Sequence, residues 1–125
     1  MSQFLSKLDV EQVEDTSHEG RGTWKLTAPL VYQSDIAATT ITVPVGFVTD
    51  FASVPRVPMI FDWLGDRGNL AATIHDYLYT APHPLASRDL ADSVLLEALI
   101  VQGVSQVEAD AIYAGVRVGG ASYYD

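Results

Sequence analysis

Residues 87–103 read SRDLADSVLLEALIVQG and carry the clearest helix signals in the chain. Ser87 suits an N-cap, and Asp89 places a negative charge in the first turn, where the helix dipole favours it. Gly103 follows the last residues of the helix, as a C′ glycine does. Asp92 is the unusual residue, because its helical neighbours towards the C-terminus are leucines at 95, 96 and 99. An ionised carboxylate in such surroundings is costly unless it is paired.

Two further helices are expected on either side of this segment. Asn69 is a suitable N-cap for a helix over Leu70–Tyr79, which the prolines at positions 82 and 84 would end. Residues 105–108 read SQVE and form a capping box, which predicts a third helix to about Val118. Three helices therefore occupy the C-terminal half.

The N-terminal half shows strand patterns. Residues Trp24–Thr27 alternate apolar and polar side chains, Leu30–Tyr32 continues them after Pro29, and Thr39–Val45 is rich in β-branched residues. Residues 1–20 suit either an edge strand or a mobile arm. Strands followed by helices predict an α+β fold, with a small antiparallel sheet packed against about three helices in a single domain, residues 1–125.

The charge balance argues against two classes of partner. The chain holds 7 basic and 16 acidic residues, for a net charge of −9, and only two of the basic residues are lysines. Nucleic-acid binding requires clustered cations that neutralise phosphates, and anionic membranes attract basic segments. We therefore expect neither nucleic acid nor a membrane as partner. The chain has no cysteine, which excludes disulfides and thiolate metal sites.

Polar residues gather in two clusters that interrupt apolar sequence. The first is Thr49–Arg56, where Asp50, Ser53 and Arg56 either line a pocket or satisfy backbone groups in turns. The second spans two predicted helices. His75 lies at the edge of a buried stripe and needs partners for both ring nitrogens. Asp92 is one such partner if the two helices pack antiparallel, which the short connection Thr80–Ala86 favours. Arg88, four residues before Asp92, is the other natural partner of that carboxylate.

Three explanations of these clusters remain open. The first is a buried structural network in which Asp92 orients His75. The second is a divalent-metal site of His75 with Asp50 and either Asp76 or Asp92, a ligand set that suits Zn²⁺, Mn²⁺ or Fe²⁺. The third is nucleophilic catalysis by Ser53 with His75 and Asp92, although no G-x-S-x-G motif is present. The candidate catalytic set is therefore Asp50, Ser53, His75 and Asp92, with Arg56, Asp76 and Arg88 as binding residues.

The segments FVTDFASVPR (residues 47–56) and IHDYLY (residues 74–79), followed by Arg88-x-x-Ala91-Asp92, resemble a family of small tailed-phage and prophage proteins of unknown function. The resemblance extends from about Trp24 to Tyr124. It implies a phage genome and a tail-associated or assembly role, but no activity.

Two functions follow from these observations. The first is a phage virion or morphogenesis protein that is associated with the tail, binds other phage structural proteins or its own copies, and resides in the host cytoplasm during assembly or in the virion tail. The alternative is a small metal-dependent, hydrolase-like enzyme, acting on cell-wall material, with a His and carboxylate site.

Overall fold

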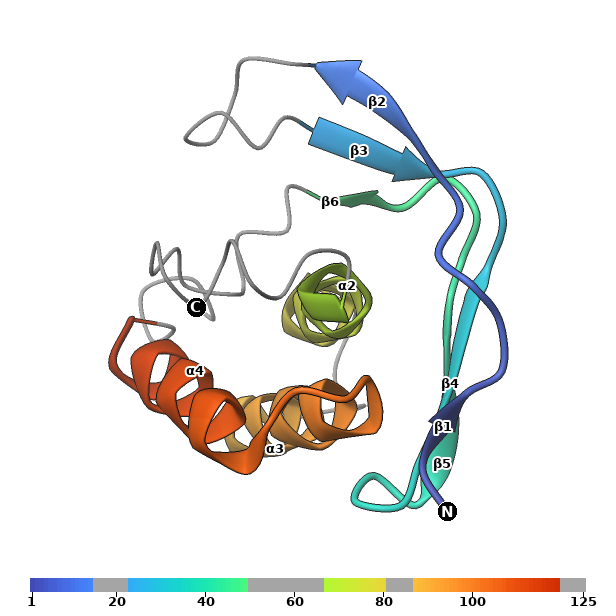
Figure 1. The fold of residues 1–125 in the computed structure, drawn as a ribbon. Coiled ribbons are helices and arrows are strands. Elements are labelled where there is room, and N and C mark those ends of the chain that lie inside the picture. Colours follow the sequence, from blue (N-terminus) through green and yellow to red (C-terminus); the bar gives the residue numbers. More distant parts are fainter. Residues whose placement is uncertain (15–22, 50–66, 81–86, 120–125) are drawn as a thin grey trace.

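The computed structural model describes residues 1–14, 23–49, 67–80 and 87–119, and these ranges show an α+β fold, as the sequence predicts (Figure 1). The strands are β1 (Gln3–Phe4), β2 (Val10–Glu14), β3 (Thr23–Leu26), β4 (Leu30–Ser34), β5 (Thr39–Val43) and β6 (Val48–Thr49). The helices are α2 (Arg67–Thr80), α3 (Arg88–Val101) and α4 (Gln106–Gly119).

The described strands form two three-stranded antiparallel sheets, in the orders β1-β4-β5 and β2-β3-β6. The prediction that Leu30–Tyr32 continues Trp24–Thr27 in one sheet is therefore wrong. Pro29 lies between β3 and β4, and it cannot donate a backbone hydrogen bond to a strand ladder. The chain passes from one sheet to the other three times: between β1 and β2, between β3 and β4, and between β5 and β6. Residues 1–14 supply two short strands, which resolves the open choice for that part of the N-terminal segment.

Backbone hydrogen bonds extend the pairing of β3 with β6 beyond the ends of the two strands. The amide of Leu26 donates to the carbonyl of Phe47 at 2.9 Å, and the amide of Gly46 donates to the carbonyl of Leu26 at 2.8 Å. Gly46 has a φ of 91°, a conformation that a residue without Cβ adopts at little cost. The chain therefore turns at Gly46 between β5 and β6 while the amides of Leu26 and Gly46 stay paired.

The helix ends match the sequence signals in two of three cases. The Ser87 hydroxyl accepts from the amide of Leu90 at 3.1 Å, and the Ser105 hydroxyl accepts from the amide of Glu108 at 3.2 Å. Gly103 has a φ of 93°, as expected after the end of α3. The N-cap prediction for Asn69 is wrong, since α2 begins at Arg67 and Asn69 lies within its first turn.

Helix α2 lies between the strands and the α3–α4 pair (Figure 1). It is seen nearly end-on while α3 lies across the view, so the two helices cross instead of packing antiparallel as their short connection suggested. Apolar side chains from the strands and all three helices form the core between them: Leu26, Leu30, Tyr32, Val43, Ile74, Leu78, Val94, Leu95, Leu99, Ile112 and Val116. No helix in the described part of the chain is long and apolar enough to cross a membrane.

Candidate functional site

The carboxylate of Asp92 is at the centre of a polar cluster where α2, α3 and α4 meet. Asp92 is 0% exposed and His75 is 1% exposed. Asp92 follows Ala91 and precedes Val94 and Leu95 on the buried face of α3, all of them closed to solvent. The burial of Asp92 that its leucine neighbours predicted is confirmed.

Three side chains hydrogen-bond to this carboxylate. The Nε2 atom of His75 lies 2.7 Å from Oδ1, and the Tyr79 hydroxyl donates to the same oxygen at 2.6 Å. The Nη1 atom of Arg117 donates to Oδ2 at 2.9 Å. Both oxygens therefore have partners, which offsets the cost of burying the charge.

Each of the three helices contributes at least one side chain to the cluster. His75 and Tyr79 are four residues apart on α2, so they lie on one face of that helix and reach the same oxygen. Their rings also pack together, with centroids 4.2 Å apart. Arg117 is the basic residue in the last turn of α4. The hydrogen bonds of the cluster thereby connect α2, α3 and α4.

The pKa of Asp92 reflects two opposing effects. Burial acts to raise it, but the hydrogen bonds from His75, Tyr79 and Arg117 outweigh burial and lower the pKa below its ordinary value. Burial, together with the hydrogen bond and charge of Asp92, raises the pKa of Tyr79, which keeps its hydroxyl as a donor. Asp92 is therefore an ionised acceptor throughout the neutral range.

One ring nitrogen of His75 has no hydrogen-bond partner within the described ranges. An ionised carboxylate can only accept, so the contact with Asp92 places a proton on Nε2. The opposite nitrogen, Nδ1, is buried and has no hydrogen-bond partner among the residues that the structure describes. The predicted pairing of His75 with Asp92 is confirmed, and it leaves Nδ1 as an acceptor whenever the imidazole is neutral.

Two arginines lie near the carboxylate. Arg88 forms the i,i+4 ion pair with Asp92 that the sequence predicted, with its Nε 4.0 Å from Oδ2, and it also donates through Nη2 to the carbonyl of Arg117. Arg117 bridges Asp92 and the Oδ1 of Asp89, which is 2.8 Å away. Asp89 is exposed, as its helical position predicts, but it also takes part in this ion pair.

The other candidate residues divide into two groups. Asp50, Ser53 and Arg56 lie outside the described residues, so their convergence on His75 stays a prediction. Asp76 is described and only partly buried, one position along α2 from His75. Within the described ranges no group of three His, Asp or Glu side chains could hold a metal ion. The metal set His75, Asp50 and Asp92 requires a residue outside those ranges and likewise stays a prediction.

Sequence reasoning missed two members of the cluster. Tyr79 could have been found, because its spacing of four residues from His75 is the same signal that placed His75 at the buried stripe. Arg117 gave no such signal, since its contact with Asp92 depends on how α4 packs against α3. A basic residue in the last turn of a helix is explained by the helix dipole alone.

A second carboxylate cluster lies at the other end of α3. Glu97 accepts four hydrogen bonds: from Ser2 Oγ and Tyr32 Oη, each at 2.7 Å, from Ser34 Oγ at 2.7 Å, and from the amide of Ile36 at 3.0 Å. Burial acts to raise the pKa of Glu97, but these donors together lower it. The cluster attaches β1, β4 and the β4–β5 turn to α3. Glu97 was not among the candidate residues that the sequence indicated.

Comparison with protein families identified one match. The family described as protein of unknown function (DUF1353) matches residues 24–116, a span that includes His75, Tyr79, Asp92 and Glu97. Comparison with curated proteins and with solved structures found no match.

Proposed function

We propose that this chain, which belongs to the DUF1353 family of proteins of unknown function, is a phage virion or morphogenesis protein. In this role it is associated with the tail and acts through contacts with other phage structural proteins or with its own copies. The observation that carries the proposal is the state of Asp92, whose buried carboxylate is fully engaged by His75, Tyr79 and Arg117.

Such a carboxylate suits a structural role better than a chemical one. A group that binds or activates a substrate must present a free lone pair or proton at a surface that the substrate reaches. Asp92 is 0% exposed, and its hydrogen bonds connect three helices. Buried hydrogen-bond networks rigidify a fold and make its packing unique, and here both carboxylate oxygens of Asp92 have donors. A rigid small domain is what a structural component of a particle needs.

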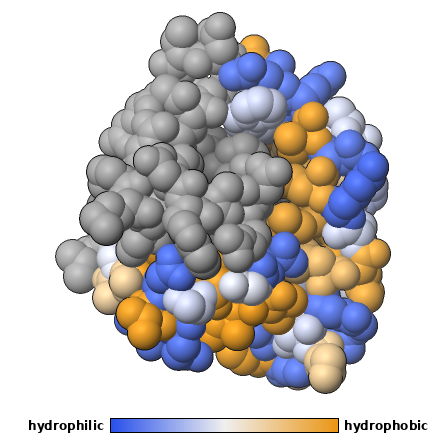
Figure 2. All heavy atoms as spheres, in the orientation of Figure 1, coloured by the Kyte–Doolittle hydropathy of each residue, from blue (hydrophilic) through white to orange (hydrophobic). Residues whose placement is uncertain are grey.

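The surface of the domain supports association with other proteins. Several large apolar side chains are exposed, among them Leu5, Val13 and Val45. On the face shown in Figure 2, apolar surface lies between hydrophilic residues over both the strands and the helices. Mixed surfaces of this kind resemble protein interfaces, which combine apolar contacts with a polar rim. The phage context itself comes from the resemblance of residues 47–56 and 74–92 to tailed-phage proteins.

Mass spectrometry of purified phage particles, combined with electron microscopy of particles made without the gene, tests this proposal. We expect the chain to be present in mature particles, or particles made without it to have defective tails. Absence from particles together with normal morphology would contradict both the virion and the morphogenesis role.

A hydrolase-like enzyme is the second candidate, and the free Nδ1 of His75 is what favours it. In catalytic His–carboxylate pairs the carboxylate orients one nitrogen while the other transfers a proton. His75 and Asp92 have that relationship, with Nδ1 unpaired among the described residues. Metal analysis of protein purified without chelator, followed by hydrolysis assays on cell-wall fragments, separates the candidates. Stoichiometric metal, or hydrolysis abolished by His75→Gln, would favour the enzyme.

A further inference from the structure

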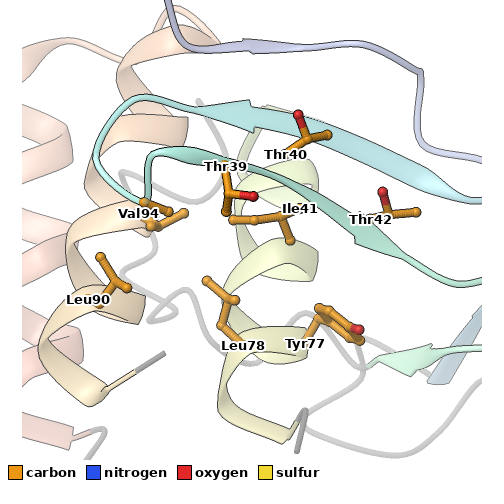
Figure 3. A pocket seen from close by; sticks show the side chains of 9 residues that line it. Thr39, Thr40, Ile41, Thr42, Tyr77, Leu78, Leu90 and Val94 are labelled. Atoms are coloured by element: carbon orange, nitrogen blue, oxygen red, sulfur yellow. The ribbon is translucent and has the colours of Figure 1, made fainter. Parts of the chain in front are cut away.

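The outer edge of β5 borders a pocket of about 140 Å³ (Figure 3). β5 is the last strand of its sheet, and within the described residues no strand pairs with its outer edge. The pocket has strand residues on one side and residues of α2 and α3 on the other: Ala37, Thr39, Thr40, Ile41, Thr42, Tyr77, Leu78, Leu90 and Val94. None of these residues is charged.

The pocket follows the edge of the strand and not one of its faces. Side chains alternate between the two faces of a strand, so Ile41 points opposite to Thr40 and Thr42. All three nevertheless line the pocket, which places it beside the backbone of β5. An edge strand offers N–H and C=O groups that an incoming extended chain can pair with.

The interior of the pocket is apolar and has room for one side chain. Leu78 and Val94 are buried at its base, while Tyr77 and Leu90 are partly exposed at its rim. An engineered apolar cavity of roughly 150 Å³ holds benzene. The pocket beside β5 therefore accommodates a group the size of a leucine or phenylalanine side chain.

The charge of the chain selects the kind of partner. Two copies, each with a net charge of −9, repel one another. A basic partner is attracted to a chain of this charge, and association with such a partner is faster at low salt.

We propose that the β5 edge binds an extended, basic segment of another protein by β-strand addition, with one apolar side chain of that segment in the pocket. The inference rests on the proposed function as a protein-binding component and names the site of contact.

A peptide titration tests this inference on the whole chain. The probe is a short synthetic peptide of alternating threonine and valine, with a central leucine and a lysine at each end. We expect slower amide hydrogen exchange in residues 39–43 when the peptide is added, with no change in β2. A matched peptide with aspartate in place of the central leucine should bind at least about tenfold more weakly. Unchanged exchange in residues 39–43, or equal binding of both peptides, would overturn the inference.

Variants that fill the pocket supply the second measurement. Ala37→Phe and Leu90→Trp each add volume at the pocket, and Val107→Phe adds the same kind of group on the exposed surface of α4. Each pocket variant with a wild-type circular dichroism spectrum should lose peptide affinity by about tenfold or more, while Val107→Phe should not. Wild-type peptide affinity in a folded pocket variant would contradict the assignment of this pocket as the binding site.

If neither pocket variant folds, the comparison of the two peptides on the wild-type chain decides whether the pocket binds an apolar side chain. Peptide binding is measured on the purified chain, so its outcome is independent of whether the protein is found in phage particles.

Discussion

The Nε2 atom of His75 and the Oδ1 atom of Asp92 lie 2.7 Å apart in the interior, although the residues are 17 positions apart on different helices. The Tyr79 hydroxyl shares that oxygen, and Arg117 binds the other one. Removing any side chain of this cluster should therefore lower the free energy of unfolding by more than the loss of its packing volume alone.

Replacement of Asp92 by alanine is expected to destabilise the protein by about 3 kcal/mol or more, because Arg117 and Tyr79 would lose their buried acceptor. In a chain of this size that corresponds to a fall in melting temperature of roughly 10 °C. Asp89→Ala is the matched control, since Asp89 is exposed and its ion pair with Arg117 should contribute less than about 1 kcal/mol. A D92A protein that melts like D89A would show that the cluster contributes little to stability.

Tyr79→Phe removes from the cluster the hydroxyl that donates to Asp92. Loss of the hydroxyl removes a donor to a charged acceptor and should cost about 1.5–3 kcal/mol in urea denaturation. Tyr113→Phe on α4 is the control, because no hydrogen bond of Tyr113 occurs within the described part of the chain, and its effect should be within about 0.5 kcal/mol. Equal stability of Y79F and Y113F would mean that the Tyr79 hydroxyl is not a significant donor.

The sequence predicted local features of the fold well and its long-range features poorly. The caps at Ser87 and Ser105 and the burial of Asp92 depend on residues within one or two helical turns, so the local pattern was sufficient. The division into two sheets depends on long-range strand pairing, such as that of β3 with β6 where Trp24 lies opposite Thr49, which no local pattern contains. The role of Glu97 was missed for the same reason, since its partners Ser2, Tyr32 and Ser34 lie 95, 65 and 63 positions away.

Glu97→Gln should loosen the attachment of β1 to α3. Glutamine retains one acceptor oxygen, so it cannot serve all four donors that bind the carboxylate. We expect faster amide hydrogen exchange in residues 3–6 and a loss of about 1–3 kcal/mol. Glu108→Gln, at the exposed capping box of α4, is the control and should leave exchange in β1 unchanged. Wild-type exchange in β1 of E97Q would contradict this role of Glu97.

The two carboxylates should also make stability depend on acidic pH. The folded-state pKa values of Asp92 and Glu97 are lowered from their ordinary values of 3.8 and 4.5. As pH falls, the unfolded chain takes up these protons first, so the stabilisation is fully present above about pH 5 and is lost progressively below it. Urea midpoints measured from neutral pH to about pH 2 should fall more steeply for wild type than for Asp92→Asn. Parallel curves would show that the Asp92 pKa is not lowered by folding.

Infectivity of a phage that carries His75→Gln tests the central claim most directly. Glutamine can still donate a hydrogen bond to Asp92, but it cannot transfer a proton as imidazole does. If the chain acts through protein contacts, this phage should form normal particles and retain its titre at a temperature where the variant is folded, while deletion of the gene should abolish the titre or damage the tail. Loss of titre with folded H75Q protein present would contradict the account and indicate chemistry at His75, and a wild-type titre after deletion would contradict the assembly role itself.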